Sequence, residues 1–214
     1  MQRQLRLGLT ELEVSTLLMS LLVSRGSELA AMPPRAHSGP TAFADTHSFP
    51  SRRRIEAGDV VSVDCCAVID RYHDNLGRTF AVGRINQRAA SLLDRASGSI
   101  IELQRTARLG HGTQSALAAA LRHVRARIAA DNIWWIGGYS LGIAFPPSWV
   151  GHAYLANEGV DKFSWQPGFV SNYENIFIDQ TEGFEAAFID TVIMTEEGIE
   201  ILSSIPRYLL SGGQ

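Results

Sequence analysis

The sequence predicts an α+β domain in which helices cover one face of a curved, mostly antiparallel sheet. The first observation is the order of the elements: one helix, then strands, two helices, and strands again. The second is that two segments, 58–83 and 169–195, each pair alternating runs across a turn, as β-hairpins do. The third is size, because 214 residues that are 45% hydrophobic can bury a sizeable core. We therefore expect residues 1–214 to form a single domain.

The first element is a helix that begins after Thr10. Thr10 and Glu13 have the spacing of a capping box, in which the hydroxyl and the carboxylate satisfy free amides at a helix start. Leucines then recur at helical spacing until Arg25-Gly26 ends the run. Residues 29–50 are rich in Pro, Ser, Ala and Gly, and their strand-like pieces are too short to assign.

The first hairpin, 58–83, holds a concentration of polar groups. Period-two alternation places Asp64 on the less apolar face of its strand. If the chain reverses near Ile69-Asp70, Asp64 faces Asn75, and Asp74 lies beside Asn75. One acid and one amide would then share the edge of a cleft.

The remaining chain supplies helices, one strand and the second hairpin. Helical patterns cover 87–105 and 113–130, a strand with a glycine-rich bend covers 134–142, and strands cover 169–179, 185–195 and 199–202. Arg-Leu-Gly precedes a helix twice, at 6–8 and at 108–110. This short repeat suggests two related halves about 102 positions apart.

Composition limits the partners. A net charge of −3 provides no basic field for nucleic acid or an anionic membrane. No run of 18 apolar residues and no signal-like start is present, so we expect no membrane partner. Cys65 and Cys66 are adjacent on a strand and point to opposite faces, which favours a reducing, cytoplasmic location. A small molecule is the expected partner.

An ordered set of motifs adds a resemblance to a known family. The motifs are Leu9-Thr10-Glu11-x-Glu13; Ser38-Gly39 followed by His47; Gly58-Asp59 followed by Val63-Asp64; Arg78-Thr79-Phe80 with Gly83; and Pro167-Gly168 followed by Glu174, Thr191-Val192 and Thr195-Glu196-x-Gly198. Together they resemble the pita-bread fold of methionine aminopeptidase, aminopeptidase P, prolidase and creatinase. Gly138–Gly142 followed by Pro146-Pro147-x-Trp149 is most similar to the Xaa-Pro-peptidase-like or ectoine-hydrolase-like branch.

The resemblance implies two pseudo-symmetric halves with an active site at the centre of the curved sheet. It also implies a homodimer. The resemblance also includes an N-terminal domain in creatinase and prolidase that we do not find in this sequence, so what closes one side of the cleft is expected to come from a partner subunit or to be absent.

The resemblance implies the metal site of the family's peptidases, in which two divalent cations are bound by Asp, Asp, His, Glu and Glu. Such ligands neutralise two hard cations and leave room for a bridging hydroxide. The resemblance places Asp64, Asn75, Tyr139, Glu174 and Ile189 at these positions. Because only two are good ligands, we expect no metal cofactor, with a single weak divalent metal between Asp64 and Glu174 as the alternative.

Three residues are candidates for catalysis, each with a structural alternative. His47, which has a matching family position, would relay a proton, or it is a strand-end histidine bonded to backbone. Glu174 would act as an acid with a raised pKa, or it is a partner for Arg78. Tyr139 would donate its phenol to an oxyanion, or it fills the volume of a lost ligand.

The remaining candidates would bind substrate or line the cleft. Asp64 and Asn75 would hold polar atoms of the substrate, or they are polar residues of a strand. Asp74 and Asp190 are each one position from a lost ligand, and that offset turns a side chain to the opposite face unless a bulge intervenes. Further lining candidates are Tyr72, Arg78, Trp149 and His152.

Three functional hypotheses follow. The leading one is a metal-independent, creatinase-like enzyme that uses acid/base catalysis on a small substrate with a polarised C–N centre, such as a hydrolysis, cyclisation or isomerisation step in a specialised biosynthetic pathway. The second is a non-catalytic module that binds a peptide or protein. The third is a divalent-metal aminopeptidase that recruits Asp74 or Asp190.

Overall fold

The computed structural model describes residues 1–40, 49–129, 132–156, 161 and 163–212. Its elements follow the predicted sequence of a helix, strands, helices and strands again. The helices are α1 (Glu11–Val23), α3 (Gln87–Ala96), α4 (Ser99–Thr106) and α5 (Thr113–Arg125), and the strands are β1 (Arg35–Ser38), β2 (Val60–Ile69), β3 (Tyr72–Ala81), β4 (Ile133–Tyr139), β5 (Ala153–Leu155), β6 (Val170–Asp179), β7 (Phe184–Thr195), β8 (Gly198–Ile201) and β9 (Leu210–Ser211).

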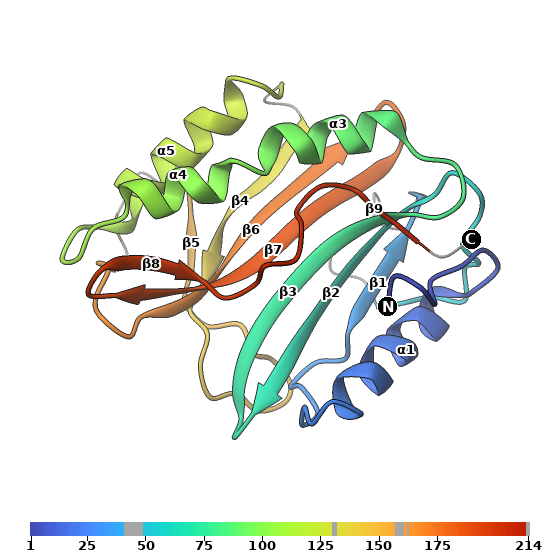
Figure 1. Cartoon of the computed structure of the whole chain (residues 1–214), viewed down its shortest axis with the longest axis horizontal. Coiled ribbons are helices and arrows are strands. Elements are labelled where there is room, and N and C mark those ends of the chain that lie inside the picture. The colour runs from blue at the N-terminus through green and yellow to red at the C-terminus, as the bar shows by residue number, and fades with distance from the viewer. Residues whose placement is uncertain (41–48, 130–131, 157–160, 162, 213–214) are drawn as a thin grey trace.

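All of these strands belong to one twisted sheet (Figure 1). Its order is β1-β2-β3-β7-β6-β4-β5, with β8 beside β7 and β9 beside β3. Every pairing is antiparallel except that of β3 with β9. The prediction of a mostly antiparallel sheet with helices is therefore confirmed.

The sheet has two related halves that meet between β3 and β7. β1, β2 and β3 in one half correspond to β4, β6 and β7 in the other, in mirrored order across the sheet. Gly8 and Gly110, in the repeated Arg-Leu-Gly, both have positive φ, at 81° and 73°. Asp64 lies six positions after Gly58, and Glu174 lies six positions after Gly168, both glycines again having positive φ. The repeat therefore places Asp64 and Glu174 at equivalent points of the two central hairpins.

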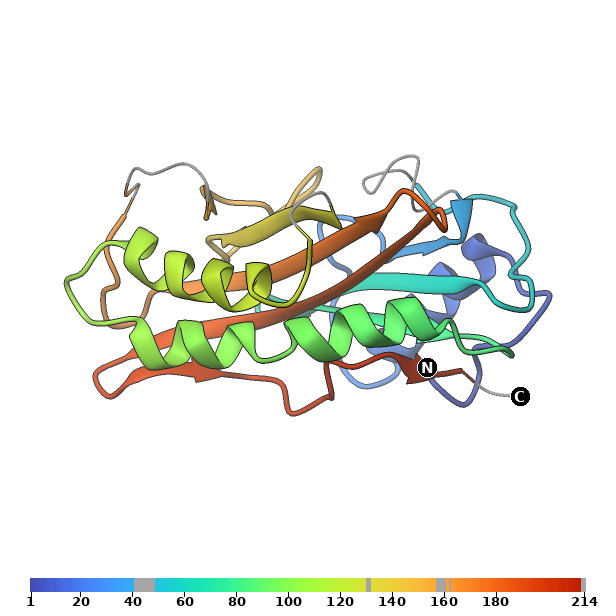
Figure 2. The same ribbon diagram turned by 90° about the horizontal axis from the view of Figure 1, so that it is seen from above.

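The helices pack on one face of the sheet. The larger core joins α3, α4 and α5 to β6 and β7, and its buried side chains include Leu93, Leu103, Leu117, Phe177 and Phe188. Figure 2 shows α3 and α4 following each other along the two long strands β6 and β7. A second core joins α1 to the first half through Val14, Leu18, Val61, Val63 and Phe80.

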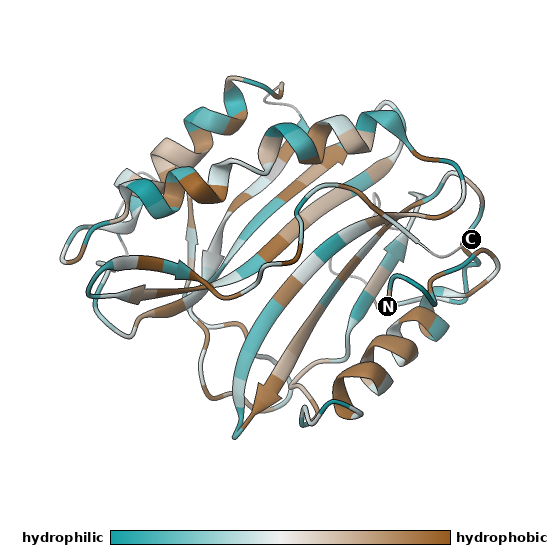
Figure 3. Ribbon diagram, in the orientation of Figure 1, coloured by the Kyte–Doolittle hydropathy of each residue, from teal (hydrophilic) through white to brown (hydrophobic). Residues whose placement is uncertain are grey.

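Alternation places a row of polar side chains on the other face. Hydrophobic and hydrophilic bands alternate along β3 (Figure 3). Because Val61, Val63 and Cys65 pack towards α1, the intervening Asp64 points away from the helices. This helix-free side of the sheet is called the open face below. None of the helices among the described residues combines the length and the apolar character that crossing a bilayer requires.

The capped first helix is confirmed, and one predicted helix is divided. Thr10 Oγ1 accepts from the Glu13 amide at 3.1 Å, while the Glu13 carboxylate accepts from the Thr10 amide at 2.7 Å. The helix predicted over 87–105 is two helices, α3 and α4, separated at Ser97-Gly98. A Cβ on Gly98 would lie 2.7 Å from Cε1 of His123, so the close approach of α5 explains the glycine at this break.

The predicted register of the first hairpin is wrong by two residues. The turn residues are Asp70 and Arg71, with φ of 48° and 66°, which is the geometry of a tight type I′ turn. Asp64 therefore lies opposite Gly77, and Asn75 lies opposite Cys66. Because an even shift keeps every side chain on its face, Asp64 and Asn75 still share the open face.

Candidate functional site

Four neighbouring strands bring a row of polar side chains together on the open face. The paired positions run from Asp64 on β2 to Gly77 on β3, Ile189 on β7 and Glu174 on β6. Residues directly paired across a sheet share one face, so Asp64 and Glu174 point to the same side. Asn75 lies two residues from Gly77 and projects to that side as well.

A hydrogen-bond network connects these residues through Asn75. Its amide nitrogen donates to Oδ1 of Asp64 at 2.5 Å. Its amide oxygen accepts from Asn172 Nδ2 at 2.8 Å and from the Tyr139 hydroxyl at 3.2 Å. The same Asn172 nitrogen also donates to Glu174 Oε1 at 2.7 Å. The network therefore links Asp64 to Glu174 through two amides.

Trp149 completes the network at the Tyr139 end. Its Nε1 donates to the Tyr139 hydroxyl at 3.1 Å. Both side chains are buried and form a small apolar cluster with Cys66, Val68 and Ala31. The phenol is thus fixed by one donor and one acceptor.

Arg35 supplies a cation at the other end of the row. It lies on β1 directly opposite Asp64. Its Nε donates to Asp64 Oδ2 at 3.0 Å, and its Nη2 contacts the same oxygen. Burial by itself lowers the pKa of Arg35, but the adjacent Asp64 carboxylate raises that pKa above its ordinary value. The guanidinium therefore stays charged, and both oxygens of Asp64 are engaged by protein groups.

Burial makes the Glu174 carboxyl a weak acid. Only 5% of Glu174 is exposed. Its burial, reinforced by the negative charge of Asp64, raises the pKa of Glu174 to about 8, although Arg35 acts in the opposite direction. Burial also raises the pKa of Tyr139 above its ordinary range. Near pH 7 the site accordingly presents a neutral carboxylic acid and a neutral phenol, both able to donate a proton or a hydrogen bond.

The comparison with known protein families decides the classification. Residues 1–196 match the profile of metallopeptidase family M24. The chain belongs to this family.

Proteins similar in sequence to this chain include peptidases and an ectoine hydrolase. The chain is 24% identical over 178 residues to a mitochondrial methionine aminopeptidase 1D from Danio rerio, covering 75% of this chain and 51% of that protein. It is 26% identical over 187 residues to an ectoine hydrolase from Halomonas elongata, covering 86% and 45%. It is 26% identical over 208 residues to an Xaa-Pro dipeptidase from Pyrococcus furiosus, covering 95% and 56%. The chain thus spans about half the length of these relatives.

Solved structures of a related fold superpose on nearly the whole chain. An X-Pro aminopeptidase from Thermotoga maritima gives a TM-score of 0.84 at 21% identity and covers 97% of this chain and 57% of that one. The prolidase from Pyrococcus furiosus gives a TM-score of 0.82 at 22% identity and covers 95% and 58%. The pita-bread fold implied by the sequence motifs is therefore confirmed.

The donor set of this M24 chain does not fit two divalent cations. Asn75, Tyr139 and Ile189 replace three of the five charged or imidazole ligands expected from the resemblance. Ile189 fills space over Gly77, where an added Cβ would lie 2.6 Å from Ile189 Cγ1. Within the described residues no group of three or more His, Cys, Asp or Glu side chains is arranged to hold a metal ion. Asp64 already holds a guanidinium in place of a metal.

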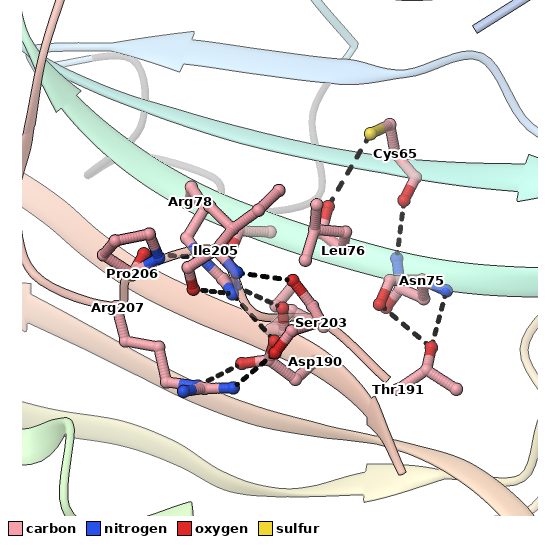
Figure 4. A network of polar contacts seen from close by, with 12 residues as sticks. Cys65, Asn75, Leu76, Arg78, Asp190, Thr191, Ser203, Ile205, Pro206 and Arg207 are labelled. Atoms are coloured by element: carbon pink, nitrogen blue, oxygen red, sulfur yellow. Dashed lines mark hydrogen bonds and ion pairs between the residues drawn. The ribbon is translucent and has the colours of Figure 1, made fainter. Parts of the chain in front are cut away.

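Several predicted lining residues lie elsewhere. Asp190 projects from the opposite face of β7 and bonds to Arg78 Nη2 at 2.7 Å and Arg207 Nε at 2.6 Å (Figure 4). Asp74 is exposed on the face of β3 opposite to Asn75. The expectation that Asp74, Asp190 and Arg78 line the cleft is thus wrong, because a one-residue offset reverses the side chain and no bulge intervenes.

Of three further candidates, two lie away from the network and one belongs to it. Tyr72, 60% exposed at the tip of the first hairpin, and the exposed His152 do not join the network. Trp149 does join it, at Tyr139. His47 lies outside the described residues, so its proton-relay role stays a prediction. Arg78 is bonded to Asp190, so the alternative that Glu174 is a partner for Arg78 is wrong.

Sequence reasoning missed Arg35, Asn172 and Glu185. Arg35 lies in the segment 29–50, where no strand was assigned, and its pairing with Asp64 exists only through β1. Asn172 lies two residues before Glu174, so period-two alternation places both on one face and was a usable signal. Glu185 has the same parity along β7 as Ile189 and could have been found in the same way.

Proposed function

We propose that this M24 chain is a metal-independent enzyme that uses acid/base catalysis on a small molecule with a polarised C–N centre. The observation that carries the proposal is the Arg35–Asp64 ion pair, which places a permanent cation at the best remaining metal ligand. Asn75 engages the second Asp64 oxygen. Charge balance at this end of the site is then provided by the chain itself.

Glu174 is the proposed acid. A carboxyl with a pKa of about 8 is protonated near pH 7 and releases its proton within the working range of a general acid. In a hydrolysis, Glu174 would give its proton to the leaving nitrogen as the C–N bond breaks and the oxygen of water bonds to carbon. Tyr139 would donate a hydrogen bond to an oxygen that gains negative charge in that step. His47 is proposed to relay the proton of the water.

The similarity to an ectoine hydrolase supports a small-molecule substrate for this chain. The loss of three ligand positions supports the metal-independent step. The aminopeptidase and dipeptidase relatives favour peptides as the substrate, with divalent metals as the alternative cofactor. Asp74 and Asp190 do not support that alternative, since both project away from the open face.

A non-catalytic binding module is a second candidate, favoured by one specific observation. The polar side chains of the network bond mainly to one another, and Asp64, Asn75 and Asn172 are buried. Such a network stabilises a core without any turnover. A binding module would keep its affinity when Glu174 loses its proton, whereas an enzyme would lose turnover.

Turnover with and without metal tests the proposal. The full chain is incubated with ectoine, Gly-Pro or Met-Ala in EDTA or in Mn²⁺, and products are followed by NMR. We expect turnover of the small molecule in EDTA and a loss of about 10²–10⁴-fold in Glu174→Gln. The exposed Glu200→Gln serves as the matched control and should keep full activity. Cleavage of the dipeptides only in Mn²⁺ would contradict the proposal.

A further inference from the structure

Glu185 is a second buried carboxyl on the open face. It lies near the start of β7, four residues before Ile189, and so projects to the same side as the Asp64–Glu174 row. At about 3.3 Å per residue, its Cα lies about 13 Å along the strand from that of Ile189. Glu185 is therefore on the same surface as the proposed catalytic site but at a distance from it.

One oxygen of Glu185 has no partner. Glu185 is 4% exposed, and within the described part of the chain its buried Oε2 makes no hydrogen bond. The carboxyl does interact with the Ser62 side chain. A buried acceptor without a donor destabilises a fold. A group kept at such a cost fits a role in which the donor arrives with a ligand.

The surrounding charges specify what kind of donor is missing. Arg35 acts electrostatically on Glu185, and so do the carboxyls of Asp64 and Glu174. Arg35 is already bonded to Asp64. Within the described residues, Arg35 is the cation that acts on Glu185, and its bond to Asp64 leaves an ionised Glu185 without a cationic partner of its own.

We infer that Glu185 receives a cationic N–H group of the ligand, an amidinium, guanidinium or ammonium, through its unpartnered oxygen. The inference rests on the proposed function and narrows its substrate class to small molecules that carry a positively charged nitrogen. The bond formed would be a charge-assisted hydrogen bond, the strong class in a buried site. Asp64, held by Arg35, does not compete for that cation.

The protonation of Glu185 is consistent with this role. Burial raises the pKa of Glu185 to about 8, with Asp64 and Glu174 adding to the rise while Arg35 and Ser62 oppose it. Without a ligand the carboxyl is neutral near pH 7. A bound cation favours the ionised form, so binding would release the proton to solvent.

A matched pair of probes tests the inference. Acetamidinium is cationic at pH 7, and acetamide has nearly the same shape but no charge. Each is titrated into the full chain, and chemical shifts or heats are measured. We expect acetamidinium to bind at least about tenfold more tightly than acetamide. Glu185→Gln should abolish this preference, while the exposed Glu200→Gln should retain it.

Three outcomes would overturn the inference: equal affinity for the two probes, no binding of acetamidinium at all, or an unchanged preference in Glu185→Gln. If Glu185→Gln does not fold, Glu185→Asp replaces it, because it keeps the charge but withdraws the oxygens, and the preference should fall. The measurement reports binding and not turnover. Failure of the Glu185 site is therefore distinguishable from failure of metal-independent catalysis.

Discussion

Removing the guanidinium of Arg35 should leave Asp64 as an uncompensated charge inside the protein. The side chains of Arg35 and Asp64 are 22% and 7% exposed, so the pair is mostly buried. Breaking a buried pair costs about 3–5 kcal/mol. Because Arg35 is partly reached by water and Asn75 still donates to Asp64, we expect Arg35→Met to lower the free energy of unfolding by about 2–3 kcal/mol.

Thermal unfolding followed by circular dichroism measures this effect. For a chain of 214 residues, each kcal/mol corresponds to a shift of about 2–4 °C, so Tm should fall by about 4–12 °C. The control is Arg105→Met, which removes a surface ion pair whose arginine is 69% exposed. That variant should hardly change Tm, because exposed pairs are solvated and screened.

The double variant Arg35→Met/Asp64→Asn separates charge from packing. Replacing the stranded carboxylate by a neutral amide should recover part of the lost stability, since the uncompensated charge is then absent. If Arg35→Met lowers Tm no more than Arg105→Met, or if Asp64→Asn brings no recovery, Arg35 does not neutralise Asp64, and the reasoning is refuted.

Three further predictions concern neighbouring groups. Gly77→Ala should lower the free energy of unfolding by about 1–3 kcal/mol, because the new methyl group collides with Ile189. In Gly77→Ala/Ile189→Ala the loss of stability should be smaller than the sum of the two single losses. The control is Gly142→Ala, because an added Cβ there meets open space. The free energy of unfolding should fall as pH rises from about 5 to 8, because the unfolded state gives up the Glu185 proton at a lower pH than the folded state does. In denaturant titrations, this fall should be smaller in Glu185→Gln than in the unmodified chain by at least about 1 kcal/mol. Identical pH profiles of the two proteins would contradict this. Tyr139→Phe should lose about 1–2 kcal/mol, because Trp149 Nε1 would be left buried without an acceptor. An unchanged denaturation midpoint would count against the network.

The sequence predicted the elements that have strong local signals. Thr10 and Glu13 specify the first helix by their spacing alone, and alternation fixes the open face of β2 whatever the turn. The hairpin register was wrong because the turn at Asp70-Arg71 needs two residues with positive φ, and neither is the glycine that usually marks one. The break at Gly98 depends on His123 of another helix, a contact that no local pattern reveals.

The site was predicted only in part, because some of its residues carry no signal in the local sequence. Asp64, Asn75, Tyr139 and Glu174 were assigned by resemblance, and the structure brings them together in one network. Arg35 could not be placed, because its four-residue strand has no periodicity of its own and becomes visible only when paired with β2. For Asp190 the local sequence was sufficient. Its position one residue after Ile189 indicated that its side chain points to the opposite face of the strand and cannot replace the lost ligand.

Calorimetric titration of Mn²⁺ into the chelator-treated full chain tests the central claim most directly. The claim is that Arg35, Asn75, Tyr139 and Ile189 leave no site for a pair of divalent cations. We predict no saturable heat attributable to two bound ions. Binding of two equivalents of Mn²⁺, lost in Asp64→Asn and Glu174→Gln, would contradict the account.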